Sequence, residues 1–270
     1  MTILQAIVLG IVQGLTEFLP VSSSGHLVIV PVLLGWEIPE DQAFVFDVLV
    51  QIGTLAAVVV YFRSDLRAIA GAMGSGVRDR RFFEDPDARL GWQLVLATIP
   101  AGLGGLLLKD QVEAAFTDPG AVAFFLLITA GLLVLAERVG RLAKDAESLS
   151  ALDAFLIGCF QVLSLFPGVS RSGSTIAGGI TRGLRRDAAA RFAFLMSVPI
   201  MLAAGLLSLF DLAAVADPAG FFPALVTGMA FSAVTGYLAI AWLLRFLRSR
   251  PLYGFAVYVT LLAAALFFLI

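Results

Sequence analysis

The chain has 270 residues, of which 60% are hydrophobic and only 14% are charged. A soluble domain has about 25% charged and roughly 45–50% apolar residues, so this composition excludes an ordinary soluble protein. The formal net charge of −2 says little about partners, and we expect no nucleic-acid partner. The single cysteine, Cys159, excludes an intramolecular disulfide and a cysteine-based metal cage. We therefore expect one all-α polytopic membrane domain over residues 1–270.

The chain begins with an apolar segment, residues 1–35, that is interrupted by polar residues and by Pro20 and Gly25. Proline breaks the helical hydrogen-bond ladder, and glycine permits a tight reversal. Neither half, about 1–18 or about 24–34, has the roughly 20 residues needed to cross a bilayer. We therefore predict a re-entrant helix–turn–helix hairpin over this segment. No secretory signal peptide is expected, because the segment has no basic N-terminal region.

Longer apolar runs follow, and each approaches the length of a membrane span. They cover about residues 43–62, 90–108, 119–137, 192–210, 219–244 and 252–270. The sequence therefore predicts about six transmembrane helices in addition to the hairpin.

The polar part of the first hairpin has a second copy later in the chain. Residues 13–26 align without a gap with residues 161–174, at a constant offset of 148. Prolines and glycines again mark a turn, so we predict a second re-entrant hairpin over residues 153–181. Irregular backbone at membrane depth is tolerated where it is buried in protein or lines a watery cavity. The two predicted repeats cover about residues 1–138 and 150–270.

Loop charges predict the orientation of these segments, because basic loops belong in the cytoplasm. The basic connections contain Arg63, Arg67, Arg78, Arg80, Arg81 and Arg89; Arg138, Arg141 and Lys144; Arg182, Arg185, Arg186 and Arg191; and Arg245, Arg248 and Arg250. The remaining connections are acidic. This alternation predicts an inverted-topology repeat in which the first hairpin enters from outside the cell. Transporters are often built in this way, so a transporter or flippase of a lipid phosphate or other anionic substrate is the alternative function.

The first hairpin contains the only histidine of the chain, His26, just after a run of three serines. Ionisable groups at membrane depth are functional candidates. Imidazole can act as a base near neutral pH and can activate a serine within hydrogen-bond reach. We therefore take His26 as the candidate base beside Ser23, and Ser22 as a candidate substrate-binding residue. The alternative is a hydrogen-bonded structural histidine.

Glu17 follows Gln13 by four residues, so the two side chains share one face of a helix. A carboxylate beside an amide oxygen suits a hard divalent cation, Mg²⁺ or Ca²⁺, which often shares its ligands with phosphate. Zinc is not expected, because one histidine and one cysteine cannot build its usual site. The alternative is a buried, protonated Glu17 that makes only a helix contact.

In the second hairpin, Arg171 takes the place that Ser23 has in the first. Its rigid fork of donors matches phosphate oxygens. Nearby side chains could add hydroxyl groups, beside free backbone N–H groups, for an anion at a helix start. These residues are Ser170, Ser172, Ser174 and Thr175. The alternative for Arg171 is an internal salt bridge, with Glu17 itself as a candidate partner.

Three further polar residues point less specifically to a function. Asp47 and Gln51 are four residues apart in the first predicted span, and they either face the same cavity or pack structurally. Asp153 is expected to cap the first helix of the second hairpin.

Three segments carry a resemblance to a known family. Gln13-x-x-x-Glu17, Pro20-Val-Ser-Ser-Ser-Gly-His26 and Pro167-Gly-Val-Ser-Arg171-Ser-Gly-Ser-Thr175 resemble the bacitracin-resistance type of undecaprenyl pyrophosphate phosphatase. The resemblance covers essentially the whole chain. It implies an enzyme of the bacterial inner membrane that removes the terminal phosphate of undecaprenyl pyrophosphate and so recycles the lipid carrier of cell-wall synthesis. By motif position it associates Glu17 with a divalent metal, Arg171 with pyrophosphate, and Ser23 and His26 with catalysis. Some relatives have a second glutamate where this chain has Gln13.

The chemistry of the residues agrees with that activity. Pyrophosphate is concentrated negative charge, so its cleavage requires cations more than covalent chemistry. Arg171 and a Mg²⁺ or Ca²⁺ held by Glu17 would supply them. We expect Ser23 to attack phosphorus or to orient a water, with His26 as base; His26 as nucleophile stays open. An acid-phosphatase-like lipid phosphatase is excluded, because it requires a second histidine.

The lipid sets a further expectation. A polyprenyl tail stabilises membrane residence by about 0.8 kcal/mol per buried CH₂, so the tail must stay in lipid while its head group reacts. We expect a lateral opening between helices and an active site open to the periplasm. The sequence leaves the oligomeric state open, a homodimer included.

Overall fold

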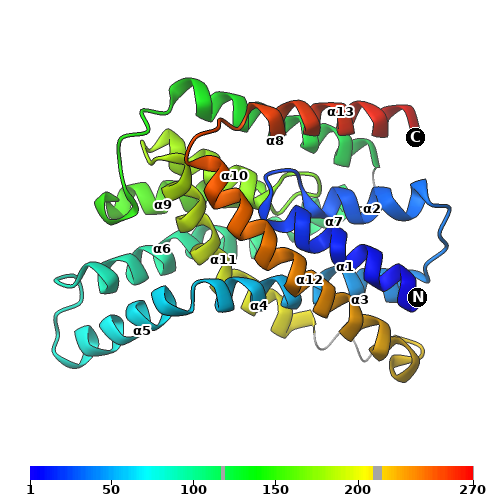
Figure 1. The fold of residues 1–270 in the computed structure, drawn as a ribbon, viewed down its shortest axis with the longest axis horizontal. Helices are drawn as coiled ribbons and strands as arrows, with labels where there is room; N and C mark the ends of the chain where they lie inside the picture. Colours follow the sequence, from blue (N-terminus) through cyan, green and yellow to red (C-terminus); the bar gives the residue numbers. More distant parts are fainter. Residues whose placement is uncertain (117–118, 209–214, 270) are drawn as a thin grey trace.

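The computed structural model describes residues 1–116, 119–208 and 215–269 (Figure 1). This part of the chain is helical, with one isolated β-bridge between Lys144 and Leu184 and no strand. Five of its helical segments are long and apolar enough to cross a membrane. They are Asp41–Tyr61, Pro86–Leu107, Gly120–Val139, Arg186–Leu206 and Pro218–Leu247. The chain is therefore an all-helical, multi-pass membrane protein.

These segments match five of the predicted spans. They correspond to α3 (Glu40–Leu49) with α4 (Gln51–Tyr61), α6 (Pro86–Leu107), α8 (Pro119–Val139), α11 (Arg186–Ser208) and α12 (Pro218–Leu247). The sixth predicted span also forms a helix, α13 (Tyr253–Leu269), but its 17 residues make it shorter than the other spans. Residues 209–210 and 270 of the predicted runs lie outside the described residues.

Both predicted hairpins consist of two short helices joined by a turn. The first has α1 (Ile3–Phe18) and α2 (Ser23–Leu33), and the second has α9 (Ala151–Leu163) and α10 (Arg171–Thr181). Every residue of α10 from Ser172 to Ile180 is buried, because α8, α9 and α11 pack around this helix. The N-terminus of α10, which carries Arg171, is thus held inside the protein.

The first helix of each hairpin packs against a long helix from the other half of the chain. Helix α1 runs along α12, and α9 runs along α6 (Figure 1). A Cβ on Gly10 of α1 would lie 2.4 Å from the backbone oxygen of Gly228. A Cβ on Gly158 of α9 would lie 2.3 Å from the backbone oxygen of Ala97. Glycine therefore permits both backbone contacts, which bring the hairpins into the centre of the helix bundle.

Two helices were not anticipated from the apolar runs. Helix α5 (Arg63–Arg78) is mixed in polarity and packs against α6, and α7 (Lys109–Phe116) is a short helix before α8. The N-terminus and the C-terminal end of α13 lie at one end of the molecule, and the connection between α5 and α6 lies at the opposite end (Figure 1).

Ion pairs fasten the start of the second hairpin. Ser150 is the N-cap residue of α9, and Asp153 completes a capping box by accepting a hydrogen bond from the Ser150 N–H (3.2 Å). Asp153 therefore stabilises this helix start, as expected, but from the first turn and not as the cap itself. Its carboxylate also pairs with Arg182 (2.7 Å) and Lys144 (3.1 Å).

Candidate active site

The turn of the first hairpin has a strained backbone. Ser22 is the N-cap of α2, and its Oγ accepts a hydrogen bond from the N–H of Gly25 (3.4 Å). The φ angle of Ser22 is 68°, in the left-handed region that residues other than glycine adopt rarely. Such conformations concentrate at functional sites, where the surrounding structure imposes them.

The turn of the second hairpin is held from outside by α8. Gly168 has a φ angle of 94°, and a Cβ there would lie 2.4 Å from the backbone oxygen of Val122. Thr129 donates a hydrogen bond to the carbonyl oxygen of Gly168 (3.1 Å) and accepts one from the N–H of Ser170 (2.9 Å). These contacts fix the backbone that presents the start of α10.

The repeated motifs have matching local structures. Ser170 caps α10 as Ser22 caps α2, accepting a hydrogen bond from the N–H of Gly173 (3.0 Å). The hydroxyls of Ser170 and Ser172 lie 3.1 Å apart, and those of Ser22 and Ser24 lie 3.2 Å apart. The sequence offset of 148 thus relates two turns that also resemble each other in hydrogen bonding.

The two turns contact each other inside the bundle. Ser172 Oγ donates a hydrogen bond to the carbonyl oxygen of Leu19 (3.0 Å), and the N–H of Gly168 donates to Ser24 Oγ (3.4 Å). Two motifs that lie far apart in the sequence therefore form a single site.

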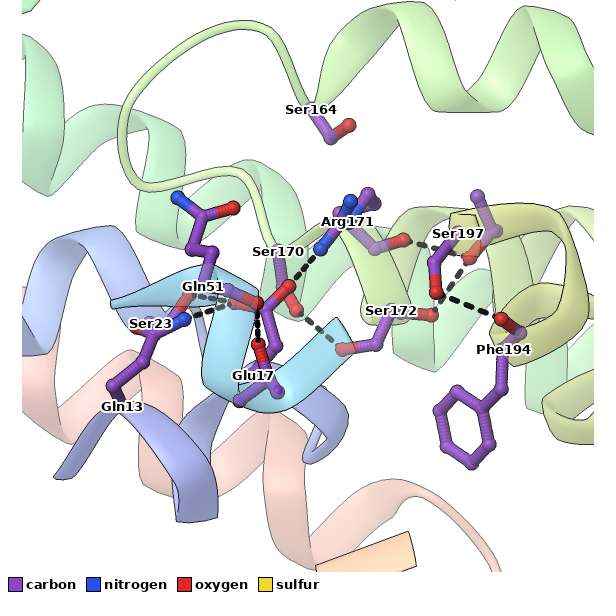
Figure 2. Close-up of polar contacts among 12 residues, drawn as sticks. Gln13, Glu17, Ser23, Gln51, Ser164, Ser170, Arg171, Ser172, Phe194 and Ser197 are labelled. Atoms are coloured by element: carbon purple, nitrogen blue, oxygen red, sulfur yellow. Dashed lines mark hydrogen bonds and ion pairs between the residues drawn. The ribbon is translucent and has the colours of Figure 1, made fainter. Parts of the chain in front are cut away.

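Glu17 is the centre of this site (Figure 2). Its carboxylate forms an ion pair with Arg171 and accepts hydrogen bonds from Ser23 Oγ (2.8 Å) and Gln13 Nε2 (2.8 Å). Only 4% of the Glu17 side chain and 20% of the Arg171 side chain are exposed. A charge this deeply buried requires partners, and here they come from both hairpins. The salt bridge considered as an alternative for Arg171 is present, and Arg171 also lines the adjacent cavity.

A cavity of about 200 Å³ adjoins the ion pair. Its walls come from both hairpins and from α4, α6 and α11. The lining residues are Glu17, Ser22, Ser23, Ser24, Gln51, Ala101, Gln161, Ser164, Leu165, Phe166, Pro167, Val169, Ser170, Arg171 and Ile200. The predicted site residues Glu17, Ser22, Ser23, Ser170 and Arg171 thus share one polar cavity.

Other predicted binding residues lie beside this cavity without lining it. Ser174 and Thr175 are buried one turn inside α10, and both hydroxyls donate to the carbonyl oxygen of Arg171 (3.1 and 2.7 Å). The hydroxyl of Ser172 donates to the carbonyl oxygen of Leu19 in the first hairpin. The hydroxyls of Ser174 and Thr175 therefore stabilise the backbone at Arg171, and the hydroxyl of Ser172 joins the two hairpins.

His26 is adjacent to the site but faces another helix. Its Nδ1–H donates a hydrogen bond to the carbonyl oxygen of Ser22 (2.7 Å), because a carbonyl can only accept. Its Nε2 lies 2.7 Å from the hydroxyl of Tyr258 on α13, and the two rings are stacked. The Ser23 hydroxyl donates to Glu17 instead. The structure thus brings Ser23 together with the carboxylate and brings the imidazole to Tyr258.

The polar wall of the cavity contains both predicted and unpredicted residues. Gln51 lines the cavity, as one of its two interpretations held, whereas Asp47 is not among the lining residues. Ser164 and Gln161 also line it; Gln161 had a signal, since it aligns with Gln13. Thr129 and Tyr258 had no comparable signal, because they lie in apolar helices outside the motifs.

The residues around Glu17 fit a hard cation. No group of three histidine, cysteine or acidic side chains forms a metal cluster within the described residues, so a metal would need oxygen atoms from the substrate or water. Mg²⁺ is commonly bound in this way, by one or two carboxylates with substrate phosphates. The Oε1 atom of Gln13 is buried without a hydrogen-bond partner beside the Glu17 carboxylate. Glu17 and Gln13 therefore offer the oxygen ligands that such a cation prefers.

This arrangement combines an activated hydroxyl with a cationic donor group. A carboxylate at 2.8 Å can accept the proton of Ser23 as its oxygen attacks an electrophile. Arg171 can donate hydrogen bonds to an anionic group within the same cavity. The geometry therefore suits transfer of a phosphoryl group from a substrate that enters the cavity.

Comparisons with known proteins agree with this geometry. The family model described as bacitracin resistance protein BacA matches residues 6–265. The chain is 46% identical to an undecaprenyl-diphosphatase of Rubrobacter xylanophilus over 265 residues, covering 97% of this chain and 96% of the relative. It is 44% identical to an undecaprenyl-diphosphatase of Anaeromyxobacter dehalogenans over 259 residues, covering 96% and 88%. It is 40% identical to undecaprenyl-diphosphatase 3 of Frankia casuarinae over 271 residues, covering 100% and 97%. The chain belongs to the bacitracin resistance protein BacA family.

Proposed function

We propose that this protein hydrolyses undecaprenyl pyrophosphate to undecaprenyl phosphate and inorganic phosphate. The observation that carries the proposal is the cluster that Ser23 and Arg171 form around the buried carboxylate of Glu17, which the two hairpins assemble at one cavity. The full-length relatives named undecaprenyl-diphosphatase support the choice of substrate. The same names give no support to the alternative of a transporter or flippase.

The reaction begins at Ser23. Its Oγ attacks the terminal phosphorus while the proton passes to the Glu17 carboxylate, and the bond from that phosphorus to the bridging oxygen breaks. The bridging oxygen leaves with undecaprenyl phosphate. Water then hydrolyses the phosphoserine and releases inorganic phosphate, and Glu17 returns its proton to Ser23. Arg171 donates hydrogen bonds to the phosphoryl oxygens, as arginine does at other phosphoryl-transfer sites.

A divalent cation, Mg²⁺ or Ca²⁺, is part of this proposal. Glu17 and the Oε1 atom of Gln13 would hold it, together with phosphate oxygens of the substrate. When bound there, the cation neutralises negative charge on the pyrophosphate. The positive charge of Arg171 is already balanced by the negative charge of Glu17. Without a cation, the negative charge of the pyrophosphate would therefore stay uncompensated.

His26 acts in this mechanism as a positioning residue. Its Nδ1–H binds the carbonyl oxygen of Ser22, the residue with the strained φ angle that immediately precedes Ser23. Holding that carbonyl fixes the start of α2 and therefore the direction of the Ser23 hydroxyl. Because Ser23 is bonded to Glu17, the carboxylate takes the role of base that the sequence suggested for the imidazole.

The proposed topology has six membrane spans and two re-entrant hairpins in an inverted repeat, with the cavity open to the periplasm. The reciprocal packing of α1 on α12 and of α9 on α6 supports it, as does the alternation of basic and acidic connections.

Apolar residues of the cavity wall, such as Ala101 and Ile200, support a lateral entrance for a head group whose tail stays in lipid. The proposal places the protein in the bacterial inner membrane.

The test is phosphate release from a polyprenyl pyrophosphate by the purified protein in detergent, where transport has no meaning. Metal-dependent release that EDTA abolishes is the expected result. No release with either Mg²⁺ or Ca²⁺ would contradict the proposed function. Molar mass in detergent, measured by light scattering, determines in the same preparation whether the active form is a monomer or a homodimer.

A further inference from the structure

Gln161 has an unusual position in the cavity wall. The residue is 1% exposed, and both its amide nitrogen and its amide oxygen are buried without a hydrogen-bond partner. Three other side chains in the described residues each have one such atom, namely Gln13, Trp92 and Ser232. Gln161 is the one among them that lines the cavity beside Glu17 and Arg171. Burying a polar group without a partner is unfavourable, so this amide needs an explanation.

The repeat shows why the amide lacks a partner. At the equivalent position of the first hairpin, the amide nitrogen of Gln13 donates to Glu17 (2.8 Å), four residues further along α1. In the second hairpin, the residue four positions after Gln161 is Leu165. A leucine cannot accept a hydrogen bond, so the N–H donors of Gln161 have no acceptor at the place where Gln13 has one.

The polar neighbours do not take over this role. Ser164 donates its hydrogen bond to the backbone oxygen of Gln161 (2.7 Å) and not to the amide. Gln51 directs its Nε2 to the backbone oxygen of Asp47 (3.2 Å). Both residues line the same cavity as Gln161, and Figure 2 shows Gln51 and Ser164 on the side of the site away from Phe194. Neither Ser164 nor Gln51 therefore bonds the amide of Gln161, because both side chains donate to backbone oxygens.

We propose that Gln161 is a further substrate-binding residue, whose amide N–H₂ donates hydrogen bonds to oxygens of the pyrophosphate group in the cavity. The terminal torsion of a glutamine is broad and nearly two-fold, so a small rotation directs the nitrogen towards the substrate. The inference rests on the proposed function, since it assigns a role in binding that same substrate. Gln161, near the end of α9, and Arg171, at the start of α10, then bind the head group from the two sides of the turn of the second hairpin.

The decisive variant is Gln161→Leu, which removes the donors and keeps a side chain of similar size. We expect KM for the polyprenyl pyrophosphate to rise about ten-fold or more, because a lost hydrogen bond to a charged group is costly. The thermal unfolding temperature should stay the same or rise, because leucine leaves no buried polar atom unpaired. Gln161→Glu should raise KM further, since a carboxylate repels the phosphate oxygens.

Gln93 is the matched control. It is also a buried glutamine, but its Nε2 donates to the backbone oxygen of Leu149 (2.6 Å), and it does not line the cavity. Gln93→Leu should lower the unfolding temperature, because the carbonyl of Leu149 loses its donor, while KM stays within about two-fold of wild type.

Binding of inorganic pyrophosphate with Mg²⁺, measured by calorimetry, provides a readout that needs no turnover. Gln161→Leu should weaken it by about ten-fold. Unchanged KM and unchanged pyrophosphate binding in Gln161→Leu would show that the amide meets only water and would overturn the inference. A lowered unfolding temperature with unchanged KM would assign Gln161 a structural role and would also overturn it. Failure of the wild type to release phosphate contradicts the proposed function instead, and pyrophosphate binding then still tests Gln161.

Discussion

Glu17 and Arg171, separated by 154 residues in the sequence, form an ion pair where the two hairpins meet. The Glu17 side chain is almost completely buried, and its remaining hydrogen bonds come from Ser23 and Gln13. The pair therefore joins the two halves of the site mechanically and places a base and an anion-binding group at one cavity.

Loss of the charge of Glu17 or of Arg171 should lower the activity strongly. Glu17→Gln and Arg171→Ala are each expected to lower kcat/KM by about 100-fold or more, which corresponds to roughly 2.7 kcal/mol of barrier. Phosphate release in detergent measures the effect, and circular dichroism checks that the variants are folded. Arg191→Gln is the control, because it breaks a more exposed ion pair with Asp65 (2.9 Å) away from the cavity. Equal losses in the control and in the site variants would contradict the assignment.

Ser23 should matter more than the neighbouring serine. Ser23→Ala removes the attacking hydroxyl, and we expect a loss of kcat of about 100-fold or more. Ser24→Ala removes a weak contact to the N–H of Gly168 (3.4 Å), and we expect a loss below about ten-fold. Similar losses in both variants would mean that the hydroxyls act only through the packing of the turns.

Tyr258→Phe should test how His26 works. The phenylalanine keeps the stacked ring and removes the hydroxyl 2.7 Å from Nε2. If His26 acts by holding the Ser22 carbonyl through Nδ1, losing the other bond costs about 1 kcal/mol, so kcat should fall by roughly five-fold. His26→Ala removes the bond to Ser22 as well and should be far more damaging. Tyr237→Phe, at a tyrosine that packs on Tyr61, is the control. Equal losses for Tyr258→Phe and His26→Ala would contradict the positioning role.

Metal dependence should respond to residue 13. EDTA is expected to abolish phosphate release, and added Mg²⁺ or Ca²⁺ to restore it. Gln13→Glu adds a carboxylate beside Glu17 and should lower the metal concentration for half-maximal activity, because hard cations bind carboxylates more strongly than amides. Gln13→Leu should raise that concentration. If residue 13 has no influence on it, the cation does not bind at Gln13.

The contact of α1 with α12 should be sensitive to a single methyl group. The Cβ of Gly10→Ala would lie 2.4 Å from the backbone oxygen of Gly228, and backbone cannot move aside as a side chain can. Overpacking of this kind costs about 1–3 kcal/mol, so the unfolding temperature in detergent should fall. Gly71→Ala, on α5 with nothing within 4 Å of the added Cβ, should leave that temperature unchanged or raise it.

Much of the architecture followed from local patterns in the sequence. Apolar runs with the length of a bilayer predicted the spans, because backbone groups in lipid must be satisfied within a helix. Pro20 predicted the break between α1 and α2, whereas Gly25, expected at the turn, lies in the first turn of α2, and Ser22 adopts the positive φ angle instead. The offset of 148 predicted that a second break follows the same pattern. Helix α5 was not predicted, because its sequence is mixed in polarity and contains no apolar run of the length of a span.

The composition of the site could be read from the motifs, but of its internal bonds only the pair of Arg171 with Glu17 was anticipated, as an alternative interpretation. Glu17, Ser23 and Arg171 were candidates by residue type alone. Their mutual contacts depend on how α1 packs on α12 and α9 on α6, since these packings decide which side chains meet across the hairpins. The partner of His26 comes from α13, 232 residues away, and the free amide of Gln161 is visible only once its surroundings are known. The sequence determined which segments form helices long and apolar enough to span a membrane, because an apolar run of that length satisfies its backbone groups within one helix. Tertiary packing decided which polar groups bind one another, because it depends on distances between helices that no local pattern encodes.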